Sequence, residues 1–185
     1  MLHLLRHPPA DVSPGVCYGR LDVPLIPGWE SSADELAKQI SMLPYITTNG
    51  LRAIYCSPSR RCAVPAAYLA ARLEIAHICD EHLREMDFGD WEGRTYEDLW
   101  RDEPAYRHWT ENWQSAQIPG GESLPMVNKR VWKFITALPE GPALLLTHAG
   151  VIRLVWAQTL AESLEHAMSR SVPFFELMDQ IPVKH

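Results

Sequence analysis

Three apolar runs of this chain each end in polar residues of the kind that bind phosphate. They are Arg6-His7 after residues 1–5, Ser57 to Arg61 after residues 51–56, and His148 after residues 143–147. Because the carboxyl ends of parallel strands meet at one edge of a sheet, we expect these side chains to lie together there. Arginine offers forked donors to phosphate oxygens, and histidine can act as a nucleophile. The pattern therefore predicts an anion site suited to phosphoryl chemistry.

A carboxylate-rich segment, residues 82–93, supplies a candidate proton donor, Glu85. The segment holds two glycines, two aromatic residues and four carboxylates, which favours a shaped loop over an amphipathic helix or strand. A carboxyl group beside a phosphate ester can protonate the leaving oxygen. Two structural alternatives stay open at this point: His148 as a buried core histidine, and Glu85 as a solvated loop carboxylate.

Two further stretches contain candidate substrate-binding residues. The long loop 8–27 carries Arg20, and loops of this length are usually functional or disordered; a surface salt bridge is the alternative for this side chain. Residues 91–113 concentrate aromatic side chains, interrupted at Pro104. They predict either a helical lid, with Trp100 and Trp109 stacking on a flat leaving group, or ordinary core packing.

The elements that must position these residues alternate along the chain. Apolar residues at helical spacing predict helices over 32–43, 124–138 and 151–160, and Ser32 with Glu35 has the form of a capping box for the first. Residues 172–178 predict a last strand. Alternating strands and helices are typical of an α/β sheet with helices on both faces.

The composition of the chain fits an ordinary globular protein. Its 185 residues suit one domain, and 46% hydrophobic and 22% charged residues are unlike a disordered chain. The net charge of −6 argues against nucleic acid as the main partner. The four cysteines form no CxxC pair, and no run is apolar and long enough to cross a membrane. We expect a cytoplasmic protein that binds neither membrane nor nucleic acid; the sequence leaves the oligomeric state open.

Six motifs taken in order resemble the histidine phosphatase superfamily, the phosphoglycerate mutase-like proteins. They are Leu4 with Arg6-His7, Gly19 to Leu25, Ser57-Pro58 to Arg61, Leu83 to Gly93, Gly120 to Ser123 with Arg130, and Thr147 to Arg153. The resemblance implies a three-layer α/β/α sandwich with a mostly parallel sheet, a single domain over 1–185 and a small helical cap at about 94–125. The short length and the run Glu85 to Gly93 most resemble the alpha-ribazole phosphatase branch.

Carried over by position, the resemblance assigns a role to each residue of the predicted site. His7 becomes the nucleophile and Glu85 the general acid, while Arg6, Arg61 and His148 hold the phosphoryl oxygens. Arg60 competes with Arg61, although the spacing from Ser57-Pro58 favours Arg61. Weaker substrate-binding assignments are Arg20, Ser57, Trp100 and Trp109. Neither a metal nor a cofactor is implied.

The chain departs from the family pattern directly after the nucleophile, where Pro8 replaces the usual glycine. Proline removes an N–H but keeps its carbonyl, so a backbone acceptor for the ring of His7 survives. The asparagine of the family's following loop is also absent, with Ser13 near its place, and Ala149 replaces a frequent glycine. These changes bear on efficiency and substrate choice more than on the type of reaction.

The main hypothesis is a metal-independent phosphatase that hydrolyses a small phosphomonoester, such as alpha-ribazole 5'-phosphate, through a phosphohistidine. A phosphoglycerate mutase-type phosphotransferase is the first alternative, but the short chain favours the phosphatase. A metal hydrolase using His7 and His148 is the second; no HxH or HExxH spacing supports it. A non-catalytic phosphate-binding module is the third.

Overall fold

The computed structural model describes residues 1–43 and 50–181. Five strands form one sheet in the order β3-β2-β4-β1-β5. Four of them run parallel: β1 (Leu2–Arg6), β2 (Ala53–Cys56), β3 (Ala76–Cys79) and β4 (Ala143–Thr147). The edge strand β5 (Leu177–Ile181) pairs antiparallel with β1. The expected mostly parallel sheet is therefore confirmed.

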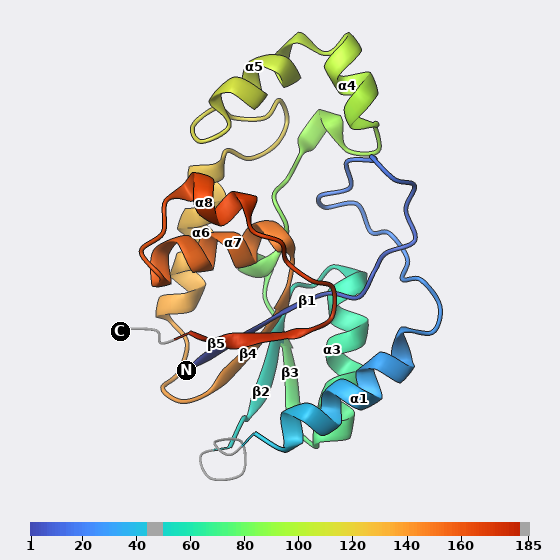
Figure 1. The fold of residues 1–185 in the computed structure, drawn as a ribbon, viewed down its shortest axis with the longest axis vertical. Helices are drawn as coiled ribbons and strands as arrows, with labels where there is room; N and C mark the ends of the chain where they lie inside the picture. The colour runs from blue at the N-terminus through green and yellow to red at the C-terminus, as the bar shows by residue number, and fades with distance from the viewer. Residues whose placement is uncertain (44–49, 182–185) are drawn as a thin grey trace.

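Helices cover both faces of this sheet, which confirms the expected three-layer α/β/α fold (Figure 1). One face carries α1 (Trp29–Ser41) and α3 (Arg60–Leu73). The other carries α6 (Leu124–Thr136), α7 (Ala149–Thr159) and the short α8 (Leu164–Ser169). Two one-turn helices, η1 (Glu81–Leu83) and η2 (Gly89–Trp91), shape the chain between β3 and the next helices.

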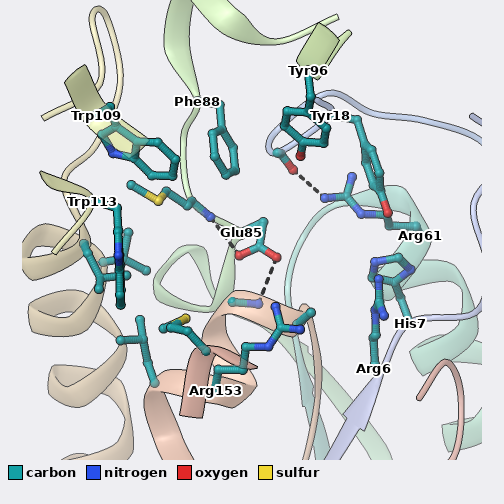
Figure 2. Close-up of a pocket in the computed structure, with 18 residues that line it drawn as sticks. Arg6, His7, Tyr18, Arg61, Glu85, Phe88, Tyr96, Trp109, Trp113 and Arg153 are labelled. Atoms are coloured by element: carbon teal, nitrogen blue, oxygen red, sulfur yellow. Dashed lines mark hydrogen bonds between the residues drawn. The ribbon is translucent and has the colours of Figure 1, made fainter. Parts of the chain in front are cut away.

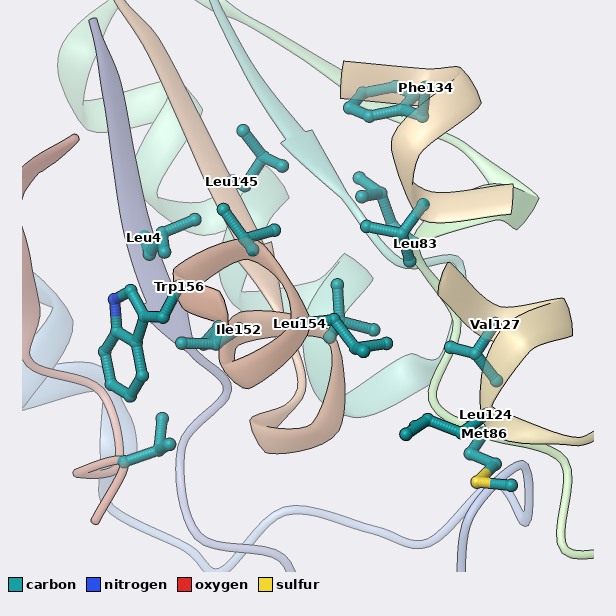
Figure 3. Close-up of a cluster of buried hydrophobic side chains, with 14 of the residues drawn as sticks. Leu4, Leu83, Met86, Leu124, Val127, Phe134, Leu145, Ile152, Leu154 and Trp156 are labelled. Atoms are coloured by element: carbon teal, nitrogen blue, oxygen red, sulfur yellow. The ribbon is translucent and has the colours of Figure 1, made fainter. Parts of the chain in front are cut away.

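The strand residues alternate between two apolar cores because successive side chains of a strand point to opposite faces. Leu4 and Leu145 pack with α6 and α7, together with Ile152 and Val127 (Figure 3). Leu5, their neighbour along β1, packs with α1 and α3 on the other face. The two central strands, β1 and β4, are thus buried on both sides, which explains their nearly continuous leucine content.

Residues 96–112 form α4 (Tyr96–Asp102) and α5 (Pro104–Asn112), which stand beyond the carboxyl ends of the strands (Figure 1). The hydroxyl of Thr95 caps α4 by accepting from the backbone N–H of Asp98. Pro104 occupies the first position of α5, where its missing N–H is harmless. The description of 94–125 as a cap on a single domain stays a prediction.

Two local predictions were wrong. The first helix begins at Trp29 after Gly28, whose φ of 90° only glycine adopts readily, so Ser32 lies inside α1 and does not cap it. Glu35 instead pairs with Lys38 one turn further on. The last strand begins at Leu177, because Phe175 has a φ of 54° that interrupts an extended chain. Residues 172–176 pack beside Arg6 and are not part of β5.

Candidate active site

A cavity of about 320 Å³ opens where β1, α3 and α7 meet the segment from Glu85 to Phe88 (Figure 2). Its polar lining comes from Arg6, His7, Arg61, Glu85 and Arg153. Its apolar lining is mainly Tyr18, Met86, Phe88, Tyr96, Trp109, Trp113, Leu124, Val127, Leu154 and Met168. The structure thus brings together four residues that the sequence predicted for one site, and it adds Arg153.

The imidazole of His7 is buried, and the contacts of its ring identify its tautomer. Its backbone N–H donates to the carbonyl of Thr147 over 3.0 Å, which fixes it at the end of β1. Its Nδ1 lies 2.6 Å from the carbonyl oxygen of Pro8. Since a carbonyl only accepts, Nδ1 carries the hydrogen, and Nε2 keeps a free lone pair.

Burial keeps this imidazole neutral. Burial lowers the pKa of His7 to about 3, and the positive charges of Arg61 and Arg6 act in the same direction, against the opposing effect of the Pro8 carbonyl. A neutral ring with a free nitrogen is the form that a nucleophile requires. The replacement of glycine by Pro8 therefore leaves the needed acceptor in place.

His148 lies behind His7 and outside the cavity lining. The two rings meet edge to face with centroids 5.3 Å apart. His148 is completely buried, and its Nε2 lies 2.8 Å from the hydroxyl of Ser57 and 3.6 Å from the sulfur of Cys62. Burial lowers its pKa well below the ordinary value, and the charge of Arg61 adds to the effect. Ser57 thus orients His148, whose contact with phosphate stays a prediction.

The guanidinium groups of Arg6 and Arg61 are anchored to backbone carbonyls on their outer side. Arg61, completely buried, donates to the carbonyls of Gly19 and Leu21. Arg6 donates to the carbonyl of Val172 over 2.8 Å and lies 3.5 Å from the centre of the Phe174 ring. In both, the buried Nε–H has no hydrogen-bond partner among the described residues. Both arginines line the cavity, and two permanent cations beside a neutral imidazole indicate an anion site.

Arg60, the exposed neighbour of Arg61, does not line the cavity. The backbone N–H of Arg60 donates to the carboxylate of Asp22 over 2.9 Å, and its side chain is not part of the cavity lining. Of the two competing arginines, Arg61 is therefore the one that reaches the site.

Glu85 lies between the basic residues around Arg61 and His7 and the tryptophans Trp109 and Trp113 of the cavity (Figure 2). Its Oε2 accepts from the backbone N–H of Gly150 over 3.2 Å, and its Oε1 from that of Met86 over 3.0 Å. A Cβ atom on residue 150 would lie only 2.4 Å from Oε1. The glycine thus leaves the room in which the carboxyl group sits.

Arg130 on α6 holds the backbone that carries Glu85. It donates to the carbonyls of His82 and Arg84 over 2.7 Å each and to that of Glu85 over 3.0 Å. Its remaining donors form a fork with Glu122 at 2.8 and 2.9 Å. The Glu122 carboxylate in turn accepts from a backbone N–H just beyond Glu85. The loop is thus fixed on both sides of Glu85.

Three of the four residues predicted to bind substrate lie outside the cavity lining: Ser57, which contacts His148, and Arg20 and Trp100. Arg20 is turned toward the same loop, with its guanidinium 3.3 Å from the carboxylates of Asp87 and Glu122. The side chain of Arg20 thus forms salt bridges, which was the alternative to substrate binding. Trp100 is 56% exposed on α4, because it faces away from the packed side of that helix. Trp109, by contrast, lines the cavity and meets Phe88 edge to face.

Arg153 is the cavity residue that the sequence reasoning left without a role. Its Nε and one terminal nitrogen donate to the carbonyl of Arg170 at 3.0 and 2.9 Å, which fixes the guanidinium at the wall of the cavity. The spacing of residues along the predicted helix could have identified it. Residues three apart on a helix share a face, so Arg153 lines the cavity on the same face of α7 as Gly150.

Neither a metal cluster nor a membrane helix is found in the described part of the chain. Over residues 1–43 and 50–181, no group of three or more His, Cys, Asp or Glu side chains is placed to hold a metal ion. Within the same residues, no helix is both long and apolar enough to cross a membrane.

Comparisons with known proteins agree with the fold and with the predicted family. A sequence profile of the histidine phosphatase superfamily (branch 1) matches residues 2–176. The phosphoglycerate mutase-like protein 4 of Arabidopsis thaliana is 29% identical over 170 residues, which cover 87% of this chain and 72% of that protein. The adenosylcobalamin/alpha-ribazole phosphatase of Salmonella typhimurium is 34% identical over 122 residues, covering 61% of this chain and 60% of that protein. The crystal structure of the alpha-ribazole phosphatase from Shigella flexneri superposes with a TM-score of 0.81 at 26% identity, covering 94% of this chain and 86% of that one.

Proposed function

Because the chain belongs to the histidine phosphatase superfamily, we propose that it hydrolyses a small phosphomonoester through a phosphohistidine on His7. The observation that carries the proposal is the order of groups across the cavity. The neutral imidazole of His7 and two arginines lie on one side, Trp109 and Trp113 lie on the other, and Glu85 stands between them. This order supports a binding mode with the phosphoryl group beside His7 and the leaving alcohol beside the aromatic wall.

In the first step the Nε2 lone pair of His7 attacks phosphorus, and the bond from phosphorus to the ester oxygen breaks. Glu85 gives its proton to that oxygen, so the alcohol leaves neutral. In the second step Glu85, now a carboxylate, takes a proton from water as the water oxygen attacks the phosphohistidine. Inorganic phosphate leaves and His7 returns to its neutral form.

The arginines supply charge stabilisation, which is the main requirement of phosphoryl transfer. Arg6 and Arg61 both line the cavity beside His7. Their backbone anchors hold the guanidinium planes still before the substrate arrives, so little reorganisation is needed during the reaction.

For the substrate we propose an ester whose alcohol carries a flat, partly apolar group, with alpha-ribazole 5'-phosphate as the first candidate. Trp109, Trp113 and Phe88 provide an aromatic wall on the leaving-group side. Proteins named as alpha-ribazole phosphatases are among the relatives in sequence and in structure. Both observations support the candidate, and a direct assay decides it.

The experiment that tests the reaction is hydrolysis of 4-nitrophenyl phosphate in the presence of EDTA, beside His7→Ala. A phosphate label from substrate is trapped by denaturing at alkaline pH and then exposed to acid. We expect activity in EDTA and an acid-labile label that His7→Ala lacks. Activity that EDTA abolishes and one metal restores would contradict the proposal. Binding of inorganic phosphate without any turnover would indicate the non-catalytic module.

The substrate class is tested by paired tryptophan variants. Trp109→Ala removes one aromatic contact, worth about 1 kcal/mol, and should raise the Michaelis constant for aryl esters about fivefold. Trp100→Ala is the matched control, since that side chain is exposed on the neighbouring helix. If both variants changed the Michaelis constant equally, or if neither changed it, the proposal that the aromatic wall binds the leaving group would be refuted.

A further inference from the structure

Two cysteines face each other at the ends of neighbouring parallel strands. Cys56 is the last residue of β2, and Cys79 is the last residue of β3; the register of the two strands pairs them directly. Both side chains therefore point to the same face, and their sulfur atoms lie 3.3 Å apart. Both are free thiols.

The backbone at this place accommodates a disulfide. Adjacent strands lie about 4.7–4.9 Å apart, within the range of about 4.4–6.8 Å that Cα atoms of bonded cysteines span. The sulfur atoms must approach to about 2.0 Å. The ends of β2 and β3 share this movement: β3 is the edge strand of the sheet and ends at Cys79, and β2 ends at Cys56.

The two thiols differ in access, which sets the order of events. Cys79 is exposed, whereas Cys56 is buried, and burial raises the pKa of the Cys56 thiol. The other two cysteines, Cys17 and Cys62, are completely buried. An oxidant in solution therefore reacts first with Cys79, and the sulfur of Cys56 is close enough to react with the oxidised Cys79.

We propose that Cys56 and Cys79 form a modification site at which a peroxide oxidant produces a reversible intramolecular disulfide. The Cys79 thiolate attacks the peroxide, the O–O bond breaks, and Cys79 becomes a sulfenic acid. The sulfur of Cys56 then attacks the sulfenic sulfur, and its proton leaves with the hydroxyl as water. The two thiols lose two electrons in total, and these reduce one peroxide.

This site connects directly to the centre described above. Ser57 follows Cys56, its backbone N–H donates to the carbonyl of Leu146, and its hydroxyl holds His148. Drawing the end of β2 toward β3 moves Ser57 away from this contact. The disulfide therefore lowers turnover; this consequence rests on the proposed function, whereas formation of the bond does not.

The bond is tested on the reduced full-length protein treated with hydrogen peroxide and then with an alkylating agent. We expect an intact mass lower by two hydrogens, two fewer alkylated thiols, a peptide cross-link between Cys56 and Cys79, and full reversal by dithiothreitol. Cys79→Ser should block all four changes. Oxidation of Cys79 to a sulfinic acid, or a cross-link between two chains through Cys79, would overturn the proposal.

Two further measurements separate the bond from its effect on activity. His7→Ala should form the disulfide as readily as the unaltered protein, so failure of the phosphatase hypothesis leaves this result standing. In the active protein, oxidation should lower kcat at least fivefold and dithiothreitol should restore it, while Cys79→Ser stays insensitive. Full cross-linking with unchanged kcat would overturn the link to Ser57.

Discussion

Replacing Gly150 by alanine should displace Glu85, the proposed general acid, while leaving the fold intact. The new Cβ atom would lie 2.4 Å from Oε1 of Glu85 and 3.2 Å from its carboxyl carbon. Contacts this short do not persist, and the atom that must yield is the end of a flexible side chain. The carboxyl group of Glu85 is therefore pushed out of its place in the cavity.

The magnitude follows from the size of the displacement. An ordinary contact needs about 3.4 Å, so the oxygen must move by about 1 Å, a misplacement that can cost about a hundredfold in rate. This loss lies within the contribution of about 10²–10⁴ that general acid catalysis makes. Stability should change by less than about 1 kcal/mol, because residue 150 lies in the first turn of α7, where alanine is a good helix former.

The assay compares two classes of ester. An alkyl phosphate needs its leaving oxygen protonated, so Gly150→Ala should lower kcat about a hundredfold. For 4-nitrophenyl phosphate, whose leaving group departs as an anion, the loss should be much smaller. Glu85→Gln is the reference variant and should show the same contrast. Unchanged turnover of the alkyl ester in a folded Gly150→Ala protein would refute the placement of Glu85, and an equal loss on both esters would refute its role as the acid.

Two more predictions concern the loop and the buried histidines. Arg130→Lys loses the paired hydrogen bonds to Glu122 and most of the bonds to the carbonyls of residues 82–85. We expect kcat to fall about tenfold or more and its pH profile to change. Arg101→Lys is the control and should change neither, because Arg101 forms only exposed salt bridges on α4. Since burial lowers the pKa of His7 from 6.5 to about 3, the unfolded chain binds a proton between these values that the folded protein does not. The free energy of unfolding, measured with urea, should therefore fall as the pH drops below about 6.5, by up to about 5 kcal/mol from this group. His7→Gln should reduce that dependence, and the part contributed by the buried His148 should remain.

The sheet and the gathering of Arg6, His7 and Arg61 could be predicted because both depend on local signals. An apolar run ended by polar residues marks the end of a buried strand, and parallel strands bring such ends to one edge. The carbonyl partner of His7 could also be expected, since proline keeps its acceptor. These inferences need only the chain near each residue and the direction of the strands.

The remaining features depend on contacts between distant segments. Trp100 and Trp109 look equivalent in the sequence, but the turn between α4 and α5 exposes one and directs the other into the cavity. Arg20 is paired with two carboxylates from elsewhere in the chain. The capping pattern at Ser32 was overridden by Gly28, whose backbone starts α1 one turn earlier.

The pairing of β1 with β4 also sets when this centre can exist during synthesis. Leu4 lies opposite Leu145, and the backbone carbonyl of Arg6 accepts from Phe175. At about 5–20 residues per second, roughly 10 to 30 s separate the translation of these partners. Throughout that interval the nascent chain carries a leucine-rich strand without its neighbour, a state prone to aggregation that molecular chaperones recognise. His7 is thus made well before the segments that surround it, so the site is complete only as translation nears β5.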